Sequence, residues 1–431
     1  MTTPSTDAPR ARRLSAPKAI LLALAVVALG VGVGVWHRYE GDLPGASRCG
    51  QLLDQATLTA SLDAGSHFLV ARQKPAGNFG YEVDWRTGNE SREDNGVRQA
   101  GAVWGLALMR QNRPSPAVDE ALDRAFSFFE ANTRRRPDGA AYVMYPGEGE
   151  GALGTVALLA LGYIDTLRVP GLPAEKAALY RKRLDGLVRF ILSARTPENL
   201  FFGSYDRAGK PLGKPSPYSD GEALLALAKT ARYLGREDLR PELLKSAEAG
   251  HRVHIVEARQ RDRDSDETKG FYQWSSMAFY ELTTSGWPEF APFGGYVIEL
   301  ADWMLDTHRV LWRTRNTGYA FEGILHAMAL ARRAGDQAHA ARFACDAERG
   351  LTRLVGWQVG GPRPNSYIAG HGPGPATLVG GVQNEAGEPA LRIDVTQHQM
   401  HATALALRWL VPGGESALPP VPAPAASSAA P

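Results

Sequence analysis

The sequence predicts an all-α fold: six inner helices form a closed ring, six outer helices cover it, and one N-terminal transmembrane helix precedes it. Three observations lead to this prediction: an unbroken apolar run near the N-terminus, a repeated alternation of amphipathic and apolar helical segments, and few stretches with strand-like alternation. Of the 431 residues, 44% are hydrophobic and 22% are charged, which excludes a disordered chain, a collagen-like fibre and a coiled coil.

The charge balance argues against a nucleic-acid partner. The chain has 48 basic and 46 acidic residues, and residues 1–18 contain four of the basic residues but a single acid. The rest of the chain is therefore close to neutral, whereas a nucleic-acid-binding protein needs a basic face. We expect no nucleic-acid partner.

The N-terminal part of the sequence predicts a membrane anchor. Residues 19–36 contain no charged side chain, and as a helix they would span about 27 Å, close to the thickness of one hydrocarbon core. Because basic residues precede this run, we predict a cytoplasmic N-terminus (1–18), a single-pass anchor in the lipid bilayer of the inner membrane (19–36) and a periplasmic main domain. A cleaved secretory signal and a buried soluble helix are the alternatives.

The segments that flank the main domain are a linker and a tail. Residues 37–50 form the predicted juxtamembrane linker, and residues 412–431 are rich in Pro, Ala and Ser, which predicts a disordered tail. Cys49 and Cys345 would both lie outside the membrane, where a disulfide between them can persist. The alternative is that Cys345 is a small buried hydrophobic residue.

Residues 51–411 are predicted to form the ring of helices. Inner helices are expected where apolar and small residues surround most of the helix, because such helices are packed on several sides. Closing the ring removes the exposed ends that the alternative, an open helical solenoid, would have to cap. The predicted inner helices cover residues 100–109, 152–163, 222–234, 275–282, 322–334 and 401–410. The predicted outer helices cover residues 52–72, 117–133, 174–195, 239–259, 296–309 and 337–354.

The junctions that lead into the inner helices would converge on one mouth of such a ring. Most of them combine an aromatic side chain with an acid or a histidine near the start of the inner helix, although helix capping also favours acids there. Aromatic faces suit stacking on sugar rings, and carboxyl groups suit hydroxyl recognition and proton transfer. The junctions are residues 78–101, 145–151, 215–222, 269–276, 316–323 and 394–401.

With these junctions, the alternation resembles the six-hairpin glycosidase-like superfamily of (α/α)6 toroids over about residues 50–411. The resemblance does not extend to a specific member. It implies a carbohydrate-active protein whose reacting groups lie at one rim of the toroid.

Four residues are predicted to be catalytic, because an acid or a histidine near the start of an inner helix can transfer protons. They are Glu150, Asp220, Glu322 and His398. Nine more are predicted to bind substrate, as aromatic platforms, polar partners or, for Arg98, a carboxylate-binding or internally paired side chain. They are Trp85, Arg98, Tyr145, Glu148, Tyr218, Glu222, Trp274, Tyr319 and Asp394.

We predict neither a metal nor a cofactor. The spacing of Asp394, His398 and His401 puts the three on one face of a helix, but nothing else in the sequence completes a metal site. Nucleophile-elbow, zincin, P-loop and dinucleotide-binding motifs are absent from the sequence. These observations favour acid–base chemistry by side chains.

The function predicted from the sequence is a membrane-anchored, extracytoplasmic protein that acts on a glycan or a uronic-acid-containing polysaccharide. Carboxylate acid–base chemistry would make it a hydrolase, a lyase or an epimerase. One alternative is a non-catalytic toroid that binds glycans or envelope partner proteins during polysaccharide assembly or export. A second alternative is an isoprenoid-processing toroid, for which an apolar cavity would be expected.

Overall fold

The computed structural model describes residues 43–411. The predicted cytoplasmic N-terminus, the anchor at 19–36, most of the linker and the tail lie outside the described residues and remain predictions. Within residues 43–411, no helix is both long enough and apolar enough to cross a membrane.

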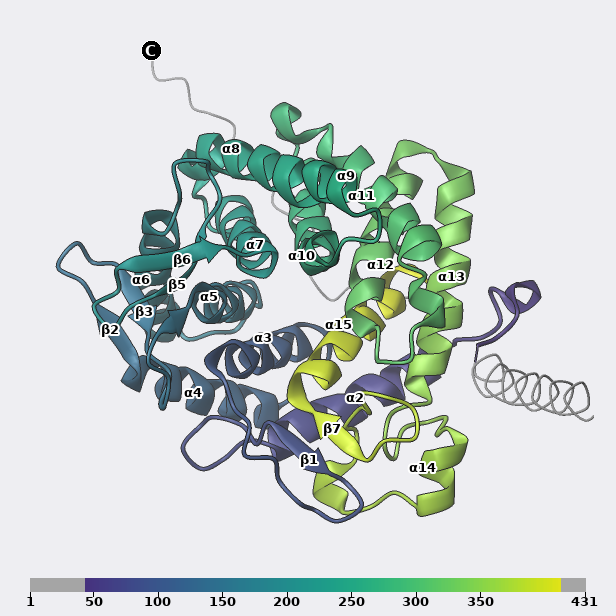
Figure 1. Cartoon of the computed structure of the whole chain (residues 1–431). Helices are drawn as coiled ribbons and strands as arrows, with labels where there is room; N and C mark the ends of the chain where they lie inside the picture. The colour runs from purple at the N-terminus through teal and green to yellow at the C-terminus, as the bar shows by residue number, and fades with distance from the viewer. Residues whose placement is uncertain (1–42, 412–431) are drawn as a thin grey trace, which may run out of the picture.

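The inner helices form a closed ring (Figure 1). Each inner helix packs against the next one along the chain, and the last, α15, packs against both α12 and α3. The contact between α15 and α3 closes the ring and excludes an open solenoid. The inner helices are α3 (Gly96–Asn112), α5 (Leu153–Leu167), α7 (Pro217–Tyr233), α10 (Asp266–Thr283), α12 (Gly318–Ala334) and α15 (Ile393–Trp409).

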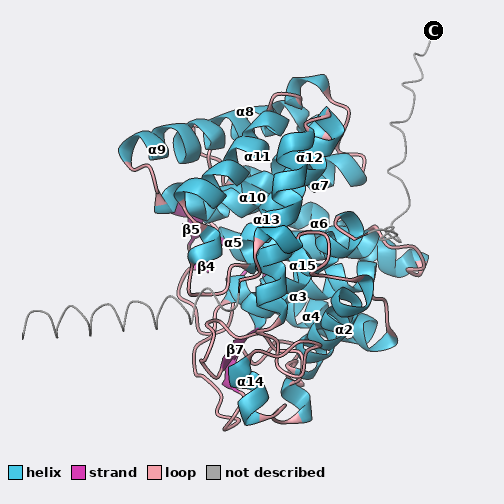
Figure 2. Cartoon of the chain, turned by 90° about the vertical axis from the view of Figure 1, so that its right-hand side faces the viewer, coloured by secondary structure: helices cyan, strands magenta, loops and turns pink. Residues whose placement is uncertain are grey.

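Outer helices surround this ring and alternate with the inner helices along the chain (Figures 1 and 2). The fourth and fifth outer elements are each composed of consecutive helical segments, and η3 and η5 within them have a wider winding than an α-helix. The outer elements are α2 (Gln55–Ala71), α4 (Pro116–Ala131), α6 (Ala174–Ser193), α8 (Arg240–Gly250) with η3 (His251–Glu257) and α9 (Ala258–Arg261), α11 (Phe293–Asp302) with η5 (Trp303–Thr307), and α13 (Gln337–Val355).

Several inner helices begin about one to two and a half turns earlier than the sequence predicted. Helix α10 begins at Asp266 and α15 at Ile393, whereas the predicted starts were residues 275 and 401. The first turns of these helices are polar, so a search for apolar residues misses them. The Asn95 side chain caps α3 by accepting a hydrogen bond from the backbone N–H of Arg98 at 3.0 Å. Residues expected on the junctions therefore lie on the first turns of inner helices.

Short strands join the connections at the end of the ring where the inner helices begin. Strand β1 (Glu82–Asp84) pairs antiparallel with β7 (Ala390–Arg392), which ties the first junction to the last. The other strands are β2 (Thr133–Arg135), β3 (Ala141–Val143), β4 (Gly151–Ala152), β5 (Phe202–Tyr205) and β6 (Pro211–Pro215). The short helices on the connections are η1 (Ala46–Arg48), η2 (Glu237–Leu239), η4 (Pro288–Phe290), η6 (Val310–Trp312), α14 (Ser366–His371) and η7 (Ala376–Leu378).

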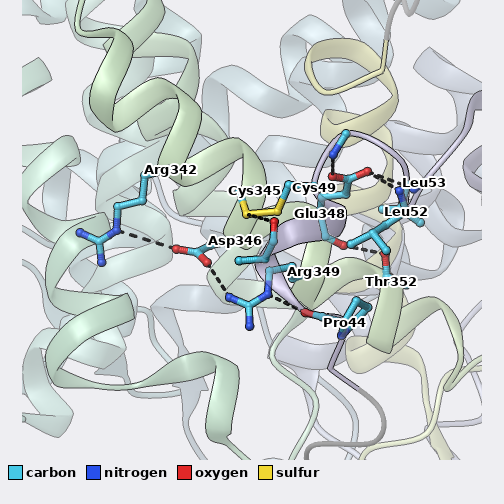
Figure 3. Close-up of a disulfide and its surroundings, with 12 residues drawn as sticks. Pro44, Cys49, Leu52, Leu53, Arg342, Cys345, Asp346, Glu348, Arg349 and Thr352 are labelled. Atoms are coloured by element: carbon cyan, nitrogen blue, oxygen red, sulfur yellow. Dashed lines mark hydrogen bonds and ion pairs between the residues drawn. A yellow bond between two sulfur atoms is a disulfide. The ribbon is translucent and has the colours of Figure 1, made fainter.

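A disulfide fastens the start of the described chain to the last outer helix (Figure 3). It joins Cys49 to Cys345 of α13, so the alternative of a free buried Cys345 is wrong. Beside it, the carboxylate of Glu348 accepts hydrogen bonds from the backbone N–H groups of Leu52 at 2.8 Å and Leu53 at 3.2 Å. The described end of the predicted linker is therefore bound to the toroid rather than loose.

Candidate functional site

A cavity of about 490 Å³ lies at the end of the ring where the inner helices begin. All six inner helices contribute side chains to it, as expected if the junctions converge on one mouth. Its chemically functional lining consists of Arg98, Tyr218, Glu222, Lys269, Gln273, Trp274, Asn316, Tyr319, Arg392, Asp394, Gln397 and His398.

Many of the lining residues come in pairs separated by four positions. Tyr218 and Glu222 line the cavity from α7, and Asp394 and His398 line it from α15. Residues four apart lie one above the other on a helix face, so the first two turns of each of these helices present one face to the cavity. This spacing explains why some acids near a helix start face the cavity and others do not.

Three cationic side chains give the cavity a positive character: Arg98, Arg392 and Lys269. The Arg392 guanidinium donates to both carboxylate oxygens of Asp394, at 3.0 Å from Nε to Oδ1, and Nε of Arg98 lies 3.4 Å from Oδ2 of the same residue. Both guanidiniums lie over the ring of Tyr81, at 4.9 and 5.4 Å from its centroid. One carboxylate thus faces two arginines, and within residues 43–411 no acid forms an ion pair with Lys269.

Glu222 is the carboxyl group with the most unusual environment. Glu222 is 4% exposed, and no described residue forms an ion pair with it. Burial therefore raises the pKa of this carboxyl group from the usual 4.5 to about 8. Gly154 of α5 makes room for this side chain, because a Cβ at that glycine would lie 2.3 Å from Oε2 of Glu222. A neutral carboxylic acid therefore borders the cavity at pH 7.

His398 is held by a buried carboxylate behind the cavity wall. Oε1 of Glu322 lies 3.2 Å from Nδ1 of His398 and 3.0 Å from Nδ1 of His401. Burial opposes charge on Glu322, but the two histidines outweigh it and lower the pKa of that carboxyl. Burial likewise opposes charge on His398, yet Glu322 raises the pKa of its imidazole above the usual value. Glu322 therefore orients His398 and leaves Nε2, which no described residue hydrogen-bonds, for a ligand.

Asp220 occupies a different environment, although it is only two residues from Glu222. Its Oδ1 accepts a hydrogen bond from the backbone N–H of Phe201 at 2.6 Å, and its Oδ2 lies 2.6 Å from Nε2 of His254. The other ring nitrogen of His254 lies 2.8 Å from Oε1 of Glu267. Burial lowers the pKa of His254, but the two carboxylates outweigh it and raise that pKa. Asp220 does not line the cavity, and all its contacts tie α7 to its neighbours.

Three residues expected in the site from the 145–151 junction lie outside the cavity. Glu150 is exposed on the turn before β4. Glu148 accepts a hydrogen bond from the backbone N–H of Gly96 at 2.8 Å, so it caps the start of α3. The buried hydroxyl of Tyr145 donates to Asp94 at 2.7 Å. Glu148 and Tyr145 therefore have structural partners, and none of the three residues lines the cavity.

Trp85 was expected to present its face to a sugar, but its side chain is buried. It contacts the rings of Tyr367 and His371 edge to face, with centroids 6.4 and 6.3 Å apart. The connection between α13 and α15 therefore covers this tryptophan, a contact that no local sequence pattern shows.

The cavity contains both predicted residues and residues that the sequence analysis missed. The predicted residues that line it are Arg98, Tyr218, Glu222, Trp274, Tyr319, Asp394 and His398. The missed polar residues are Lys269, Gln273, Asn316, Arg392 and Gln397. The four-residue spacing between Lys269 and Gln273 was a usable signal, because it matches the spacing of Tyr218 and Glu222.

Two buried hydrogen-bond donors on lining residues have no partner among the described residues. They are Nε1 of Trp274 and Nε2 of Gln397. Buried donors are nearly always satisfied in native proteins, so a ligand with acceptor oxygens would complete both. Deeper in the ring, Trp104 lies 5.8 Å from Trp274 between ring centroids and donates to Asp165, so side chains fill the interior beyond the cavity.

Comparison with known proteins identifies the fold. No protein-family model and no curated protein matches the sequence. Among solved structures, a sugar epimerase from a ruminal bacterium superposes with a TM-score of 0.56 at 10% identity, covering 82% of this chain and 98% of that one. The cellobiose 2-epimerase of Spirochaeta thermophila gives 0.54 at 16% identity, covering 83% and 96%.

A third solved structure, an unsaturated glucuronyl hydrolase specific for heparin, gives a TM-score of 0.56 at 11% identity, covering 83% of this chain and 100% of that one. At these identities the similarity shows a shared fold. The chain thus has an (α/α)6 toroid fold, as the sequence predicted.

Proposed function

We propose that the protein is an enzyme that transfers protons at an acidic sugar bound in the cavity. The observation that carries this proposal is that a neutral carboxylic acid, Glu222, and a carboxylate-held imidazole, His398, line the same cationic cavity. Acid–base catalysis needs two such groups within reach of one substrate. The carbohydrate chemistry of the structural neighbours agrees with this assignment.

The cavity offers recognition for each part of an acidic sugar. Arg98, Arg392 and Lys269 would bind its carboxylate, because guanidinium and ammonium groups form strong charge-assisted hydrogen bonds with carboxylates. The unpaired donors of Trp274 and Gln397 would bind hydroxyl oxygens. The five acidic and basic side chains in the lining do not suit an isoprenoid chain, so we do not extend that alternative.

The two proton carriers would act in different roles. With Nδ1 directed to Glu322, His398 would accept a proton at Nε2, while Glu222, protonated at neutral pH, would donate one. Removing the proton from the carbon next to a carboxylate develops negative charge, which the cations of the cavity would stabilise. Epimerisation results if Glu222 returns a proton to the opposite face of that carbon. Elimination results if Glu222 protonates a leaving oxygen.

This arrangement favours proton transfer at carbon over hydrolysis by two carboxyl groups. Glu150 and Asp220 do not line the cavity, and Glu322 lies behind His398. Asp394, the second carboxyl of the lining, is paired with Arg392. Hydrolysis by paired carboxyls needs both groups free to reach the scissile bond. The catalytic set therefore becomes Glu222 and His398, with Glu322 as a positioning residue.

A deuterium-exchange experiment tests the proposal. The protein is incubated in D₂O with oligosaccharides prepared from heparin, alginate and polygalacturonate. Epimerisation gives deuterium at the carbon next to the carboxylate, elimination gives a conjugated double bond with ultraviolet absorbance, and hydrolysis gives new reducing ends without either. Proton transfer at carbon that disappears in Glu222→Gln and in His398→Gln supports the proposal. Hydrolysis alone, or unchanged turnover in both variants, contradicts it.

The alternative of a non-catalytic glycan-binding toroid predicts a different result. In that case the wild-type chain binds an acidic oligosaccharide by calorimetry, yet none of the products appears. Binding retained in Glu222→Gln together with lost turnover would instead separate catalysis from recognition.

We also propose an extracytoplasmic, membrane-anchored location. The apolar run at residues 19–36 supports it, and so does the Cys49–Cys345 disulfide, because disulfides persist mainly in oxidising compartments. Protease protection in intact cells and its loss in spheroplasts would test this location. Full protection in spheroplasts would contradict it.

A further inference from the structure

A second groove, which we call the Trp312 groove, lies at the same end of the ring as the cavity. It encloses about 630 Å³ between the connection that enters α10 and the connection that enters α12. Its walls come from residues 262–264 on one side and residues 306–313 on the other. Neither connection contributes a proton carrier to the proposed reaction.

An exposed tryptophan marks this groove. Trp312 is 53% exposed, and within residues 43–411 it is one of four large hydrophobic side chains with such exposure. Tyr218, which lines the cavity, is the other aromatic residue among the four. Both exposed aromatics thus lie at the mouth. Exposing an indole face costs free energy unless a ligand covers it, and aromatic faces suit sugar rings.

The walls of the groove are fixed before any ligand binds. The indole N–H of Trp303 donates to the carbonyl of Arg263 at 2.8 Å, and Nδ1 of His308 lies 2.7 Å from Oδ1 of Asp264. Arg309 has a left-handed backbone, with φ 55°, which is costly for a residue with a side chain. Two hydrogen bonds therefore join the two connections, and the one that carries Trp312 includes a residue in a costly backbone conformation.

The unpaired charges of the groove are mainly cationic. Its lining contains three arginines and three aspartates, but Asp264 is paired with Arg313 and Asp306 with Arg342, which leaves Asp262 as the acid without an ion pair among the described residues. Arg313 pairs with Asp264 at 3.1 Å, whereas no described residue forms an ion pair with Arg309 or Arg263. Two exposed guanidiniums are therefore available beside the exposed indole. This combination matches a sugar ring that carries an acidic group.

The Trp312 groove and the cavity are joined by one connection. The segment that presents Trp312 continues to Asn316 and then to Tyr319, both of which line the cavity. Asn316 lies four positions after Trp312, so their Cα atoms lie at most about 14 Å apart. On the other wall, Lys269 of the cavity lies 6.0 Å from the Tyr319 ring and follows the segment that forms the groove. A chain of a few sugar units would span both sites.

We propose that the Trp312 groove is a second glycan subsite, which binds another acidic sugar unit of the same polymer whose reacting unit occupies the cavity. The proposal rests on the proposed function and adds to it that the substrate is an acidic chain rather than a monosaccharide. Trp312 stacks on the distal sugar ring, and Arg309 and Arg263 bind its acidic group.

Chain-length dependence tests the subsite. Binding of heparin, alginate and polygalacturonate oligosaccharides, from disaccharide to octasaccharide, is measured by calorimetry with wild-type protein, Trp312→Ala and Arg309→Gly. Glycine keeps the left-handed backbone while it removes the charge. We expect each variant to weaken octasaccharide binding about fivefold to tenfold and to leave disaccharide binding unchanged. Leu179→Ala, at a 45% exposed position on α6, is the matched control and should change neither.

The outcomes separate this proposal from the proposed function. Trp312-dependent binding of long acidic chains without turnover keeps the subsite and contradicts the enzyme. Turnover whose KM does not depend on chain length, or on Trp312 and Arg309, keeps the enzyme and overturns the subsite. Equal weakening for short and long chains, tighter binding of neutral cello-oligosaccharides, or no binding of any probe also overturns it.

Discussion

Two histidines at the same end of the ring are each held by carboxylates, but only one of them can meet a ligand. Both nitrogens of His254 are occupied, by Asp220 and Glu267, behind the wall formed by α7 and α10. His398 uses Nδ1 for Glu322 and lines the cavity with the rest of its ring. His254 and its carboxylates therefore stabilise the fold, whereas His398 can take part in a reaction.

Position along the chain therefore does not decide the role of a polar residue in this site. Asp220 lies in the first turn of α7, and Glu222 follows it by two positions. Two residues correspond to about 200° around a helix, so the two side chains point to nearly opposite sides. Asp220 faces the outer helix, where His254 pairs with it, while Glu222 faces the cavity without a charged partner.

The largest expected effect is on turnover. Glu222→Gln should lower kcat about 10²–10⁴-fold, because it removes a positioned proton donor, whereas Asp220→Asn should keep kcat within about tenfold. Steady-state kinetics on the acidic oligosaccharide that the wild-type enzyme turns over measures both. If Asp220→Asn is as inactive as Glu222→Gln while its circular dichroism is unchanged, the assignment of different roles to the two carboxyl groups is wrong.

The free energy of unfolding should depend more on Asp220 than on Glu222, the reverse of the order expected for turnover. Asp220→Ala removes one of the two carboxylates that contact the buried His254. This substitution should lower the free energy of unfolding by about 3–5 kcal/mol. Glu222→Gln replaces an unpaired neutral acid by an amide of similar shape and should change it by under about 1 kcal/mol at pH 5. Denaturant titration measures both values. A double-mutant cycle with His254→Ala checks the pairing, and additive losses would contradict it.

Glu322→Gln should have an intermediate effect on activity. Without the carboxylate, burial lowers the pKa of His398 with less opposition, so this pKa should fall and the acidic limb of the pH–rate profile should move to lower pH. We expect kcat to drop roughly tenfold to a hundredfold, since the imidazole loses its orienting partner. NMR titration, with His398→Gln to assign the signal, measures the pKa. An unchanged His398 pKa would show that Glu322 does not act on it.

The last expected effect is a gradual dependence of the stability on pH. The pKa of Glu222 is raised from 4.5 to about 8, so the folded state binds the proton more tightly than the unfolded chain. The stabilisation is complete below pH 4.5, is lost as pH rises to about 8, and stays constant above that. The stability of the wild-type chain relative to Glu222→Gln should fall by up to about 1.4 kcal/mol per pH unit in this window. A flat difference would show that Glu222 is ionised at neutral pH.

Much of the architecture could be predicted because it follows from local periodicity. Helices that are apolar on most sides must lie inside others, and six of them alternate with six amphipathic segments. The starts of the inner helices were predicted late, since first turns such as Asp394–His398 are polar where they border the cavity. The predicted site included Glu222, Trp274 and His398 for the same reason that it included Trp85, namely their place at a junction.

The remaining parts of the site depend on contacts between distant segments. Arg392 was missed because nothing in its neighbourhood shows which side of the strand faces the mouth. Lys269 was missed although its four-residue spacing to Gln273 was a usable signal. Trp85 is covered by the connection between α13 and α15, and Glu148 is bound to the start of α3. Each of these outcomes brings together residues from different hairpins of the toroid.

The sequence by itself determined the helical alternation and which end of the ring holds the polar residues, because both are properties of spacing along one chain. Only the tertiary structure decided that α15 meets α3, that Cys49 meets Cys345, and that Glu222 rather than Asp220 borders the cavity. The physical reason is that burial and pairing depend on which neighbour fills the space beside a side chain. That neighbour comes from a part of the chain tens to hundreds of residues away.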